Sequence, residues 1–437
     1  MKSSKYNLFF RDHEGNRYAF NGISGGLLML SDKDNKKIHE MLTTPPNLMS
    51  EDDLDSRIMN PLRDGGFIID DKVDELEILK ARNRIVRFSG KTLFLTIMTT
   101  HSCNFRCNYC FQDHYSQSMS PEVQDLLVNF VSYSTKSCER LYIHWFGGEP
   151  LLCIPLIKSL SMQFMKICEA NSCHYSASLS TNGYLLKENV AAELSQLGIK
   201  NIRVTLDGPP EIHNKRRPLA DGHDTFDVIL ENILEASKYV NMGLRINIDQ
   251  ENIRLIPALL DILKACKLGR GVLCDFVPTT PFASSCTNNC FSAVPDDILW
   301  DSMKKIYEMA LGRGIGLRLS SIIKARHCFF DDANSLMIDT DGKMYKCALD
   351  EKHLVGKLDN SEPMKYKLNY LPWAEWIASD PFIDSECREC KMLPMCMGGC
   401  TLKGQIFGKE SKCPVWKNHP GEYILINVAA GINEPLH

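Results

Sequence analysis

The chain has 437 residues, of which 44% are hydrophobic and 24% are charged, and its formal net charge at pH 7 is −4. This length allows two or three domains, and the slightly acidic balance argues against a nucleic-acid-binding surface as the main function. No apolar run approaches the ~18 residues that a membrane span needs, and Arg11 and Asp12 interrupt the apolar start, so we expect no membrane segment and no secretory signal.

Residues 1–88 contain no cysteine and combine short strands with helices. The expected strands are 6–10, 17–21, 27–30 and 67–70, and the expected helices are 33–42, 52–62 and 73–87. This pattern predicts a small winged-helix-like α+β domain. It resembles the peptide-recognition domain of enzymes that modify ribosomally made peptides, in which a leader peptide adds as a strand to a sheet edge. A cap domain without that role is the alternative.

The chain contains 18 cysteines, and none of them precedes Cys103. Without a signal peptide, so many cysteines favour metal binding in a reducing cytoplasm over disulfides. Cys103, Cys107 and Cys110 are spaced Cys-x3-Cys-x2-Cys and follow an expected strand at 93–98. Three thiolates can hold three irons of a cubane cluster and leave the fourth iron open for a ligand.

This stretch resembles the cluster motif of radical S-adenosylmethionine (radical SAM) enzymes. The resemblance implies a 4Fe-4S cluster whose open iron binds SAM, which is cleaved to methionine and a 5′-deoxyadenosyl radical, and it counts Tyr109 among the SAM-binding residues. A structural zinc loop completed by His101 or His114 is the alternative for this motif alone.

From residue 93 to 319, strands and helices alternate, which predicts a parallel sheet with crossover helices. The expected strands are 93–98, 141–146, 175–179, 201–206, 243–248 and 272–277. The expected helices are 120–134, 155–170, 187–196, 225–239, 252–266 and 295–313. Six such units fit a partial (β/α)6 TIM-type barrel, the α/β fold that the radical SAM family shares.

Polar motifs follow the second and third of these strands. Gly147, Gly148 and Glu149 resemble the family's Gly-Gly-Glu-Pro loop, in which the glycines allow close approach of the methionine amino group and the acid can accept from it. Ser180 and Asn182 resemble residues that hold the SAM ribose or carboxylate, although this segment could equally be a helix N-cap.

The fourth and fifth strands end in similar motifs. Thr205 and Asp207 resemble the family's Ser-x-Asp-Gly segment, with Thr in place of Ser. Either Arg216 or Arg217 could contact the SAM carboxylate, and the spacing favours Arg217. Asn247 resembles a position that faces the cofactor. We assign no catalytic acid or base. Between residues 279 and 295, Cys286 and Cys290 form either part of a lid or a pair of surface thiols.

A second cysteine constellation resembles the SPASM extension of radical SAM enzymes, which holds two auxiliary 4Fe-4S clusters. The resemblance implies that four cysteines ligate the outer cluster and three the inner one. The outer ligands would be Cys387, Cys390, Cys396 and Cys413, and the inner ligands Cys328, Cys347 and Cys400. Asn334 stands where some relatives have a further cysteine, so the inner cluster has either an open iron or an oxygen ligand such as Asp331 or Asp332. Zinc is the alternative for residues 387–400.

We therefore expect three domains: residues 1–88 for peptide recognition, 89–320 as the radical SAM core and 321–437 as the SPASM domain. The resemblance implies a cytoplasmic maturase that uses SAM and three 4Fe-4S clusters to cross-link side chains of a precursor peptide, with flavodoxin or ferredoxin as reductant. An anaerobic sulfatase maturase is the nearest alternative, but Ala348 stands where such enzymes have an Asp that is the presumed base. A non-catalytic iron–sulfur electron carrier is the alternative of another class.

Overall fold

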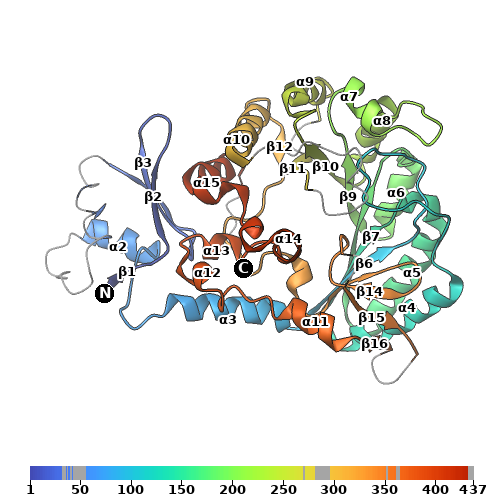
Figure 1. Cartoon of the computed structure of the whole chain (residues 1–437), viewed down its shortest axis with the longest axis horizontal. Coiled ribbons are helices and arrows are strands. Elements are labelled where there is room, and N and C mark those ends of the chain that lie inside the picture. Colours follow the sequence, from blue (N-terminus) through green and yellow to red (C-terminus); the bar gives the residue numbers. More distant parts are fainter. Residues whose placement is uncertain are drawn as a thin grey trace. The chain divides into compact units, whose positions relative to one another are not determined.

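The computed structural model describes residues 1–31, 36, 38, 39, 42, 56–268, 271–280, 296–350, 353–360 and 365–431. The chain forms two compact units, each built from more than one segment (Figure 1). The first unit comprises Met1–Arg87, Leu319–Cys328 and Ser379–His437, and the second comprises Phe88–Arg318 and Phe329–Ala378. Junctions between the units fall at residues 87/88 and 318/319, and residues 321–437 are divided between both units, so the division into three functional domains stays a prediction.

An 11-stranded sheet forms the centre of the second unit. Six parallel strands stand side by side in chain order, as the alternating pattern predicts. They are β6 (Thr92–Met98), β7 (Arg140–Phe146), β8 (His174–Thr181), β9 (Ile199–Thr205), β10 (Asn241–Ile248) and β11 (Val272–Pro278). The short β12 (Gly316–Leu317) adds in parallel beyond β11. The predicted α/β fold with a partial (β/α)6 barrel is confirmed.

The crossover helices also lie close to their predicted ranges. They are α4 (Pro121–Ser134), α5 (Ile154–Ala170), α6 (Glu188–Gln196), α8 (Phe226–Ala236), α9 (Ile256–Ala265) and α10 (Asp296–Gly312). Ser120 caps α4 by accepting a hydrogen bond from the Val123 amide, and Pro121 occupies the first helical turn, where its missing N–H costs nothing. The short α7 (Pro210–Arg216), which the sequence did not predict, follows β9.

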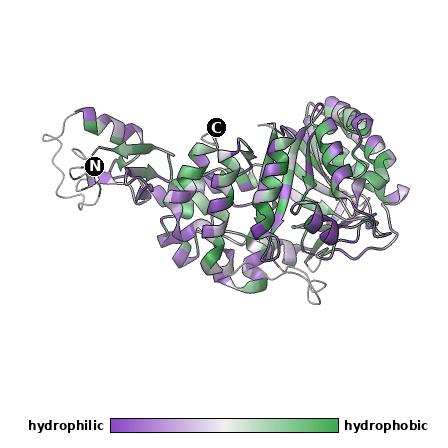
Figure 2. Ribbon diagram, turned by 90° about the horizontal axis from the view of Figure 1, so that it is seen from above, coloured by the Kyte–Doolittle hydropathy of each residue, from purple (hydrophilic) through white to green (hydrophobic). Residues whose placement is uncertain are grey.

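The two faces of the parallel strands differ in character, because side chains alternate with period two. On β7, Ile143 and Trp145 are fully buried beneath the helices, and Trp145 stacks on Phe164 of α5 with 6.3 Å between ring centroids. The opposite face carries partly exposed polar side chains such as Tyr142 and His144. Figure 2 shows the matching change from hydrophobic to hydrophilic residues within single turns of the helices. The helix-covered face therefore forms the core, and the inner face is left for function.

Four strands extend this sheet at its other edge, and none of them was predicted. They are β13 (Ser335–Ile338), β14 (Lys343–Tyr345), β15 (Leu354–Leu358) and β16 (Tyr366–Leu368), and α11 (Tyr370–Ile377) follows them. β13 pairs with β6 in parallel, and the other three strands continue antiparallel. This pairing explains why residues 329–378 belong to the barrel's unit.

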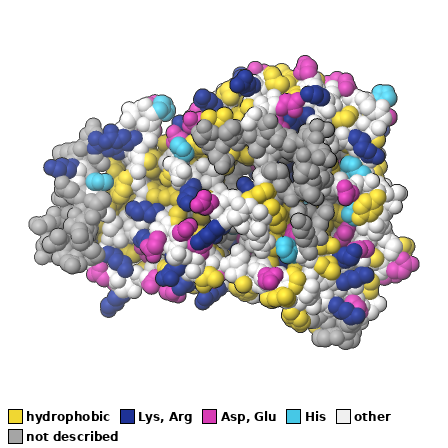
Figure 3. All heavy atoms as spheres, viewed as in Figure 1, with side chains coloured by type: hydrophobic (Ala, Val, Ile, Leu, Met, Phe, Trp, Pro, Cys, Tyr) yellow, Lys and Arg dark blue, Asp and Glu magenta, His cyan; other side chains and the backbone are white. Residues whose placement is uncertain are grey.

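One helical stretch bears on the expectation that the chain has no membrane segment. By length and composition alone, Pro150–Ala170 is apolar enough to cross a membrane. In the fold it includes α5, the crossover between β7 and β8, and Ile157, Leu160 and Phe164 on it are fully buried. Those are the properties of a core helix. On the face drawn in Figure 3, basic and acidic side chains are interspersed, in keeping with the small net charge.

The N-terminal part of the first unit contains two small sheets. β2 (Asn7–Arg11), β3 (Arg17–Asn21) and β4 (Leu27–Leu30) form an antiparallel sheet in that order, and β1 (Lys2–Ser3) pairs with β5 (Ile68–Ile69). The helices are α2 (Ser56–Asp64) and α3 (Glu75–Phe88). The predicted strands are confirmed, and most of the predicted helix 33–42 lies outside the described residues.

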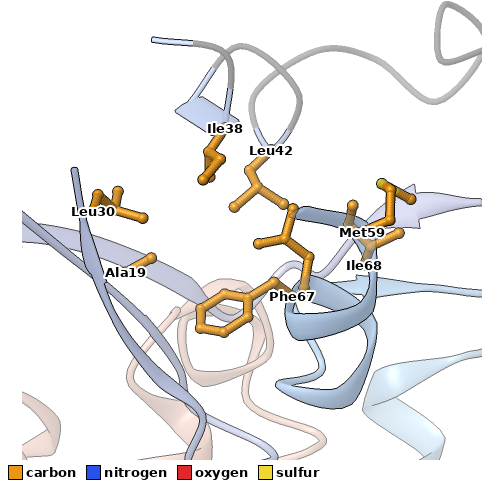
Figure 4. Close-up of a cluster of buried hydrophobic side chains, with 8 residues drawn as sticks. Ala19, Leu30, Ile38, Leu42, Met59, Phe67 and Ile68 are labelled. Atoms are coloured by element: carbon orange, nitrogen blue, oxygen red, sulfur yellow. The ribbon is translucent and has the colours of Figure 1, made fainter. Parts of the chain in front are cut away.

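A hydrophobic cluster joins the three-stranded sheet to α2 and β5 (Figure 4). Phe67 and Leu62 are fully buried in it, and Ala19, Leu30, Ile38, Leu42, Met59 and Ile68 surround them. Fully burying a side chain of this size stabilises by about 1.5–3 kcal/mol. Residues 1–69 therefore have a core of their own.

The C-terminal part of the first unit consists of short helices. These are α12 (Ser385–Glu389), α13 (Leu393–Cys396), α14 (Thr401–Phe407) and α15 (Pro420–Ala429). A second hydrophobic cluster brings Tyr6 and Leu79 from the N-terminal part together with Phe382, Leu393 and Met397. The cysteine-rich C-terminal segment is thus packed against the N-terminal domain within the same unit.

Candidate active site

The first cysteine loop leaves the C-terminal end of β6. Two isolated bridges, Thr100 with Ser118 and Phe105 with Leu219, fix its course. The amide of Cys110 donates to the carbonyl of Cys107 at 3.2 Å, which folds the three cysteines into a tight turn. All three cysteines are partly buried.

The electrostatics of these thiols show that they lie together beside one cation. Burial raises the pKa of Cys103 to about 11 and that of Cys107 to about 12, and it raises the pKa of Cys110 as well. Charge on Cys103 or Cys110 raises the pKa of Cys107 further, whereas the guanidinium of Arg217 lowers the pKa of all three. A positive charge is therefore placed where thiolates would otherwise be unfavourable.

The glycines after β7 bring a second loop into contact with the cysteine loop. The Gly148 amide donates to the Thr100 carbonyl at 2.8 Å, and the Glu149 amide donates to the Ser102 carbonyl at 2.9 Å. A Cβ on Gly148 would stand 2.4 Å from the Ser102 oxygen, and Gly147 has a φ of +148°. These glycines therefore permit close approach of the cysteine loop; an additional approach to SAM stays a prediction.

Glu149 is completely buried, and the loop after β8 surrounds its carboxylate. Oε1 accepts from the Thr181 hydroxyl at 2.6 Å and from the Leu151 amide, and Oε2 accepts from the Asn182 amide at 2.7 Å. Burial raises the pKa of this carboxyl, and the three hydrogen bonds oppose that shift. The Asn182 side chain in turn donates to Asn104 at 2.8 Å. Glu149 thus ties two strand-end loops together, and its contact with an ammonium group stays a prediction.

Asp207, after β9, is the centre of a buried polar network. Its Oδ1 accepts from the Asn247 amide at 3.0 Å and from Asn247 Nδ2 at 3.1 Å, while its Oδ2 accepts from the Tyr109 hydroxyl. Arg217 Nη1 donates to the same hydroxyl and stands 3.9 Å from Asp207. Four residues that the sequence singled out on four separate segments therefore meet beside the cysteines.

The structure distinguishes the two candidate arginines. Arg216 forms a buried ion pair with Asp249 at 2.8 Å, whereas Arg217 faces the cysteine loop. Burial lowers the pKa of Arg217, but Cys107, Tyr109 and Asp207 outweigh that effect and raise it, so the guanidinium is charged. Its Nε–H is buried and has no hydrogen-bond partner among the described residues. This orphan donor fits an anionic ligand such as the carboxylate of SAM.

Ser180 and Thr205 lie on the inner faces of their strands and are partly exposed. The hydroxyl of Ser180 is 3.1 Å from Nε2 of His144, whose Nδ1 is 2.8 Å from the Ser178 hydroxyl. Burial and nearby arginines lower the pKa of His144 to about 4, so this ring is neutral at pH 7. Sequence reasoning missed His144, although its alternation with the buried Ile143 and Trp145 could have placed it inside.

A second missed contact fixes the start of the cysteine loop. Nε2 of His101 is 2.8 Å from Oδ1 of Asp339, which follows β13, and the His101 ring stacks on Tyr115 at 4.3 Å. His101 was considered as a zinc ligand, but here its ring nitrogen Nε2 is engaged in the hydrogen bond with Asp339. No sequence signal pointed to Asp339, because the two residues are 238 positions apart.

The C-terminal cysteines of the first unit form another cluster. Charge on Cys390 and Cys387 raises the pKa of Cys396 beyond the main effect of burial, and Cys413 similarly affects Cys387. Lys417 Nζ is 3.4 Å from the Cys413 sulfur. The four predicted outer ligands therefore influence one another electrostatically, and their joint ligation of a cluster stays a prediction.

Two glycines make this arrangement possible. Gly398 and Gly399 have φ values of +86° and +76°, which favour glycine. The Cys400 amide donates to the Lys412 carbonyl at 3.2 Å, and a Cβ on Gly399 would stand 1.9 Å from that same oxygen. Only a residue without a side chain lets the segment at Cys400 pass so close to the one that carries Cys413.

The predicted inner ligands are distributed over both units. Cys328 and Cys400 belong to the first unit and Cys347 to the second, so their joint ligation stays a prediction, as does an oxygen ligand from Asp331 or Asp332. Cys286 and Cys290 lie outside the described residues. No three His, Cys, Asp or Glu side chains within the described ranges are placed to hold a single metal ion. A cubane does not require such convergence, since each of its cysteines binds a different iron.

Comparisons with known proteins agree with this geometry. Residues 97–262 match the Radical SAM superfamily. The chain is 25% identical over 275 residues to a tungsten-containing aldehyde ferredoxin oxidoreductase cofactor-modifying protein of Pyrococcus furiosus, covering 59% of this chain and 70% of that protein. It is 24% identical over 346 residues to a cysteine-type anaerobic sulfatase-maturating enzyme of Clostridium novyi, covering 71% and 88%. Its match to the GTP 3′,8-cyclase of Campylobacter jejuni is 31% identical and spans 38% of this chain but about half, 48%, of that enzyme.

Solved structures share the fold. Native anSMEcpe with bound AdoMet and Kp18Cys peptide has a TM-score of 0.61 at 20% identity, covering 78% of this chain and 99% of that one. SuiB of Streptococcus suis bound to precursor peptide SuiA has a TM-score of 0.52 at 13% identity, covering 95% and 99%. The superfamily uses SAM and a 4Fe-4S cluster. With its three cysteines at the end of β6 and its partial barrel, this chain contains a radical SAM domain at residues 97–262.

Proposed function

We propose that this protein is a radical SAM maturase that oxidatively modifies, by cross-linking, side chains of a ribosomally made precursor peptide. The observation that carries the proposal is the meeting of Tyr109, Asp207, Arg217 and Asn247 beside the three-cysteine loop. An iron–sulfur electron carrier would have no use for this network or for the buried orphan donor of Arg217.

The residues of the barrel have distinct tasks in this proposal. Cys103, Cys107 and Cys110 hold a cluster with one open coordination position, and the Arg217 Nε–H binds the carboxylate of SAM. A cluster and SAM bound by these residues would supply the radical chemistry for removing hydrogen from the substrate. Asp207 orients Arg217 through Tyr109, while Gly148 and Glu149 hold the cysteine loop against the strand ends.

The C-terminal cysteines would provide an exit for electrons. Cys387, Cys390, Cys396 and Cys413 are proposed to hold an outer 4Fe-4S cluster, and Cys328, Cys347 and Cys400 an inner one. The proximity of the four outer cysteines supports the first assignment. Oxidative cross-linking removes electrons from the substrate, and auxiliary clusters held by these cysteines would be able to accept them. A flavodoxin or ferredoxin of the cytoplasm would be the reductant.

The N-terminal sheet is proposed to bind the leader of the precursor. β4 pairs only with β3 among the described strands, so it is an edge to which a peptide strand can add. Met29 on this strand is 70% exposed. Deleting the whole domain would be a poor test, since Tyr6 packs against Phe382, Leu393 and Met397. Met29→Asp should instead weaken leader binding, while the equally simple change Met162→Asp, at an exposed position of α5, should not.

The decisive experiment is anaerobic co-expression with short peptides encoded beside this gene, followed by mass measurement. Loss of hydrogen from one peptide supports oxidative cross-linking, and 5′-deoxyadenosine should form with SAM and a strong reductant. Unchanged peptide masses together with absent 5′-deoxyadenosine in fully reconstituted protein would favour an electron carrier. Equal leader affinity of the Met29→Asp and Met162→Asp variants would contradict the leader site.

A sulfatase maturase is the second candidate, because of the similarity to the Clostridium novyi enzyme over 88% of its length. Ala348 directly after Cys347 argues against it, since an alanine cannot act as a base. Conversion of a cysteine-containing sulfatase peptide to formylglycine would establish this activity in place of cross-linking.

A further inference from the structure

Three arginines converge on the inner face of the barrel, and Arg245 Nε donates to Asn247 Oδ1 at 2.9 Å. Arg203 lies on β9, Arg245 on β10, and Arg318 directly follows β12. Gly243 on β10 lies between the arginines. Its register partner on β9 is Arg203, and a Cβ added to Gly243 would stand 3.4 Å from Arg318 Nη1. Burial lowers the pKa of Arg203, and the charges of Arg318 and Arg245 lower it further, as expected for neighbouring cations. The missing side chain of Gly243 leaves room between them.

The surrounding groups do not balance this positive charge. Asp275, the register partner of Arg245 on β11, is the carboxylate that acts on Arg203. None of the three arginines forms an ion pair with a carboxylate among the described residues. The nearby His144 is neutral, with a pKa of about 4. One carboxylate thus faces three guanidinium groups. This leaves an excess of positive charge in a confined space, which attracts an anion.

The three arginines are accessible to solvent. Their position along the strands can be compared with that of the proposed SAM contacts. Arg203 and Arg245 are partly exposed and Arg318 is exposed. Thr205 and Asn247 follow Arg203 and Arg245 two positions later on the same strand faces, toward the ends where the cysteine loop lies. Two residues of a strand span about 6.6 Å. A bound anion would therefore sit about one pleat deeper in the barrel than the proposed SAM contacts.

We propose that Arg203, Arg245 and Arg318 form a subsite for a carboxylate of the peptide substrate, carried by an Asp or Glu side chain or by a C-terminus. This inference rests on the proposed function, which supplies the peptide. A planar guanidinium binds a carboxylate through paired hydrogen bonds, and the neutral His144 and Ser178 beside it can bind polar atoms of the same residue. The subsite would hold an acidic residue next to the side chain that is modified.

Binding can be measured without knowledge of the natural peptide. The probes are Nα-acetyl-glutamate amide, its neutral isostere Nα-acetyl-glutamine amide, and Nα-acetyl-alanine with a free C-terminus, titrated into anaerobically reconstituted protein with SAM present. We expect the glutamate probe to bind at least tenfold more tightly than the glutamine probe. The alanine probe shows whether a C-terminal carboxylate serves as well as a side chain.

Variants locate the binding to the arginines. Arg245→Gln should lower the affinity for the glutamate probe about 10- to 100-fold, as expected for the loss of charged hydrogen bonds. Arg245→Lys should retain part of the affinity that Arg245→Gln loses. The matched control Arg254→Gln, at an exposed position outside the barrel interior, should bind normally. If Arg245→Gln does not fold, the preference of the unmodified protein for glutamate over glutamine still decides.

Two results would overturn the inference. Equal binding of the glutamate and glutamine probes would show that no carboxylate subsite exists. Tighter binding of GTP than of either carboxylate probe, with the same dependence on Arg245, would assign the arginines to a nucleotide. Formation of 5′-deoxyadenosine by the same preparation is measured in parallel. Its presence without carboxylate binding would refute the subsite alone, whereas its absence would count against the proposed function.

Discussion

The two cysteine clusters of this protein differ in what surrounds them. Around Cys103, Cys107 and Cys110 stand a buried arginine, a tyrosine, a carboxylate and an asparagine that are bonded to one another. Around Cys387, Cys396 and Cys413 the charged neighbours include Lys412 and Lys417, and Lys412 forms an ion pair with Asp384 at 2.9 Å. The first surroundings suit a ligand, while the second simply balance negative charge.

The two clusters also differ in their number of cysteines, and this difference points to the same distinction. Three cysteines in the barrel leave a cubane with an open position, whereas four cysteines in the C-terminal segment would close one. Open metal sites perform chemistry and closed ones support structure or carry electrons. The comparison teaches that cysteine spacing predicts a cluster, but that the side chains around it predict what the cluster is for.

The largest effect should come from removing a cysteine of the open site. Cys107→Ala should abolish formation of 5′-deoxyadenosine from SAM, because a two-cysteine site no longer holds the cluster. Iron should fall by about 4 per chain in the reconstituted protein. The matched variant Cys413→Ala should also lose iron, yet still cleave SAM without a peptide. If both variants stop SAM cleavage equally, the two clusters do not have separate tasks.

The next effect concerns the cation of the open site. Arg217→Gln removes the orphan Nε–H and leaves Asp207 without its guanidinium, so the affinity for SAM should fall about 10- to 100-fold. Equilibrium binding of SAM to the anaerobic protein measures this change. Lys215→Gln, which loses only an exposed ion pair with Glu251, should bind SAM as the unmodified protein does. Unchanged affinity in Arg217→Gln would remove this residue from the SAM site.

The sequence predicted the barrel well because two physical signals repeat along it. Strands such as β7 alternate buried and polar side chains, and caps such as Ser120 mark helix starts. Local motifs also indicated most of the residues that the fold gathers beside the first cysteine loop, since the ends of parallel strands meet at one edge. The extension β13–β16 escaped prediction because its strands are only three to five residues long, and because β13, which joins them to the barrel, pairs with β6 far away in sequence.

The sequence failed to indicate several residues around the site for the same reason. His144, Arg203 and Arg318 belong to no local motif, and only the closing of the sheet places their side chains together. Likewise, the Asp339 carboxylate meets His101 through the pairing of β13 with β6. The packing role of Gly148 was missed for a related reason: the sequence shows that Gly148 has no side chain, but only the fold shows that the Ser102 carbonyl oxygen lies in that space.

A smaller effect should follow from filling that space. Gly148→Ala places a Cβ 2.4 Å from the Ser102 carbonyl oxygen, so the cysteine loop must move. We expect a loss of roughly 1–3 kcal/mol in unfolding free energy, together with weaker SAM binding. Gly312→Ala is the control, since nothing lies within 4 Å of its Cβ position in α10, and it should be neutral or stabilise by about 0.5–1 kcal/mol. Denaturant unfolding under anaerobic conditions compares the two, and equal stabilities would mean that the two loops are not in close contact.

The smallest expected effect is on the pH dependence of the unfolding free energy. It should distinguish a histidine on the inner face of the barrel from a histidine on the exposed surface. His144 has a pKa of about 4 when folded and about 6.5 when unfolded, so the unfolded chain binds the proton more tightly between these values. Folding is therefore destabilised as the pH falls below 6.5, by up to about 2 kcal/mol at pH 5 from this group. His144→Gln, which keeps hydrogen-bonding atoms near Ser178 and Ser180, should lose correspondingly less stability between pH 7 and pH 5. His13→Gln, at an exposed position, should follow the unmodified protein. If His144→Gln shows the same pH dependence as the unmodified protein, the ring is not held neutral inside the barrel.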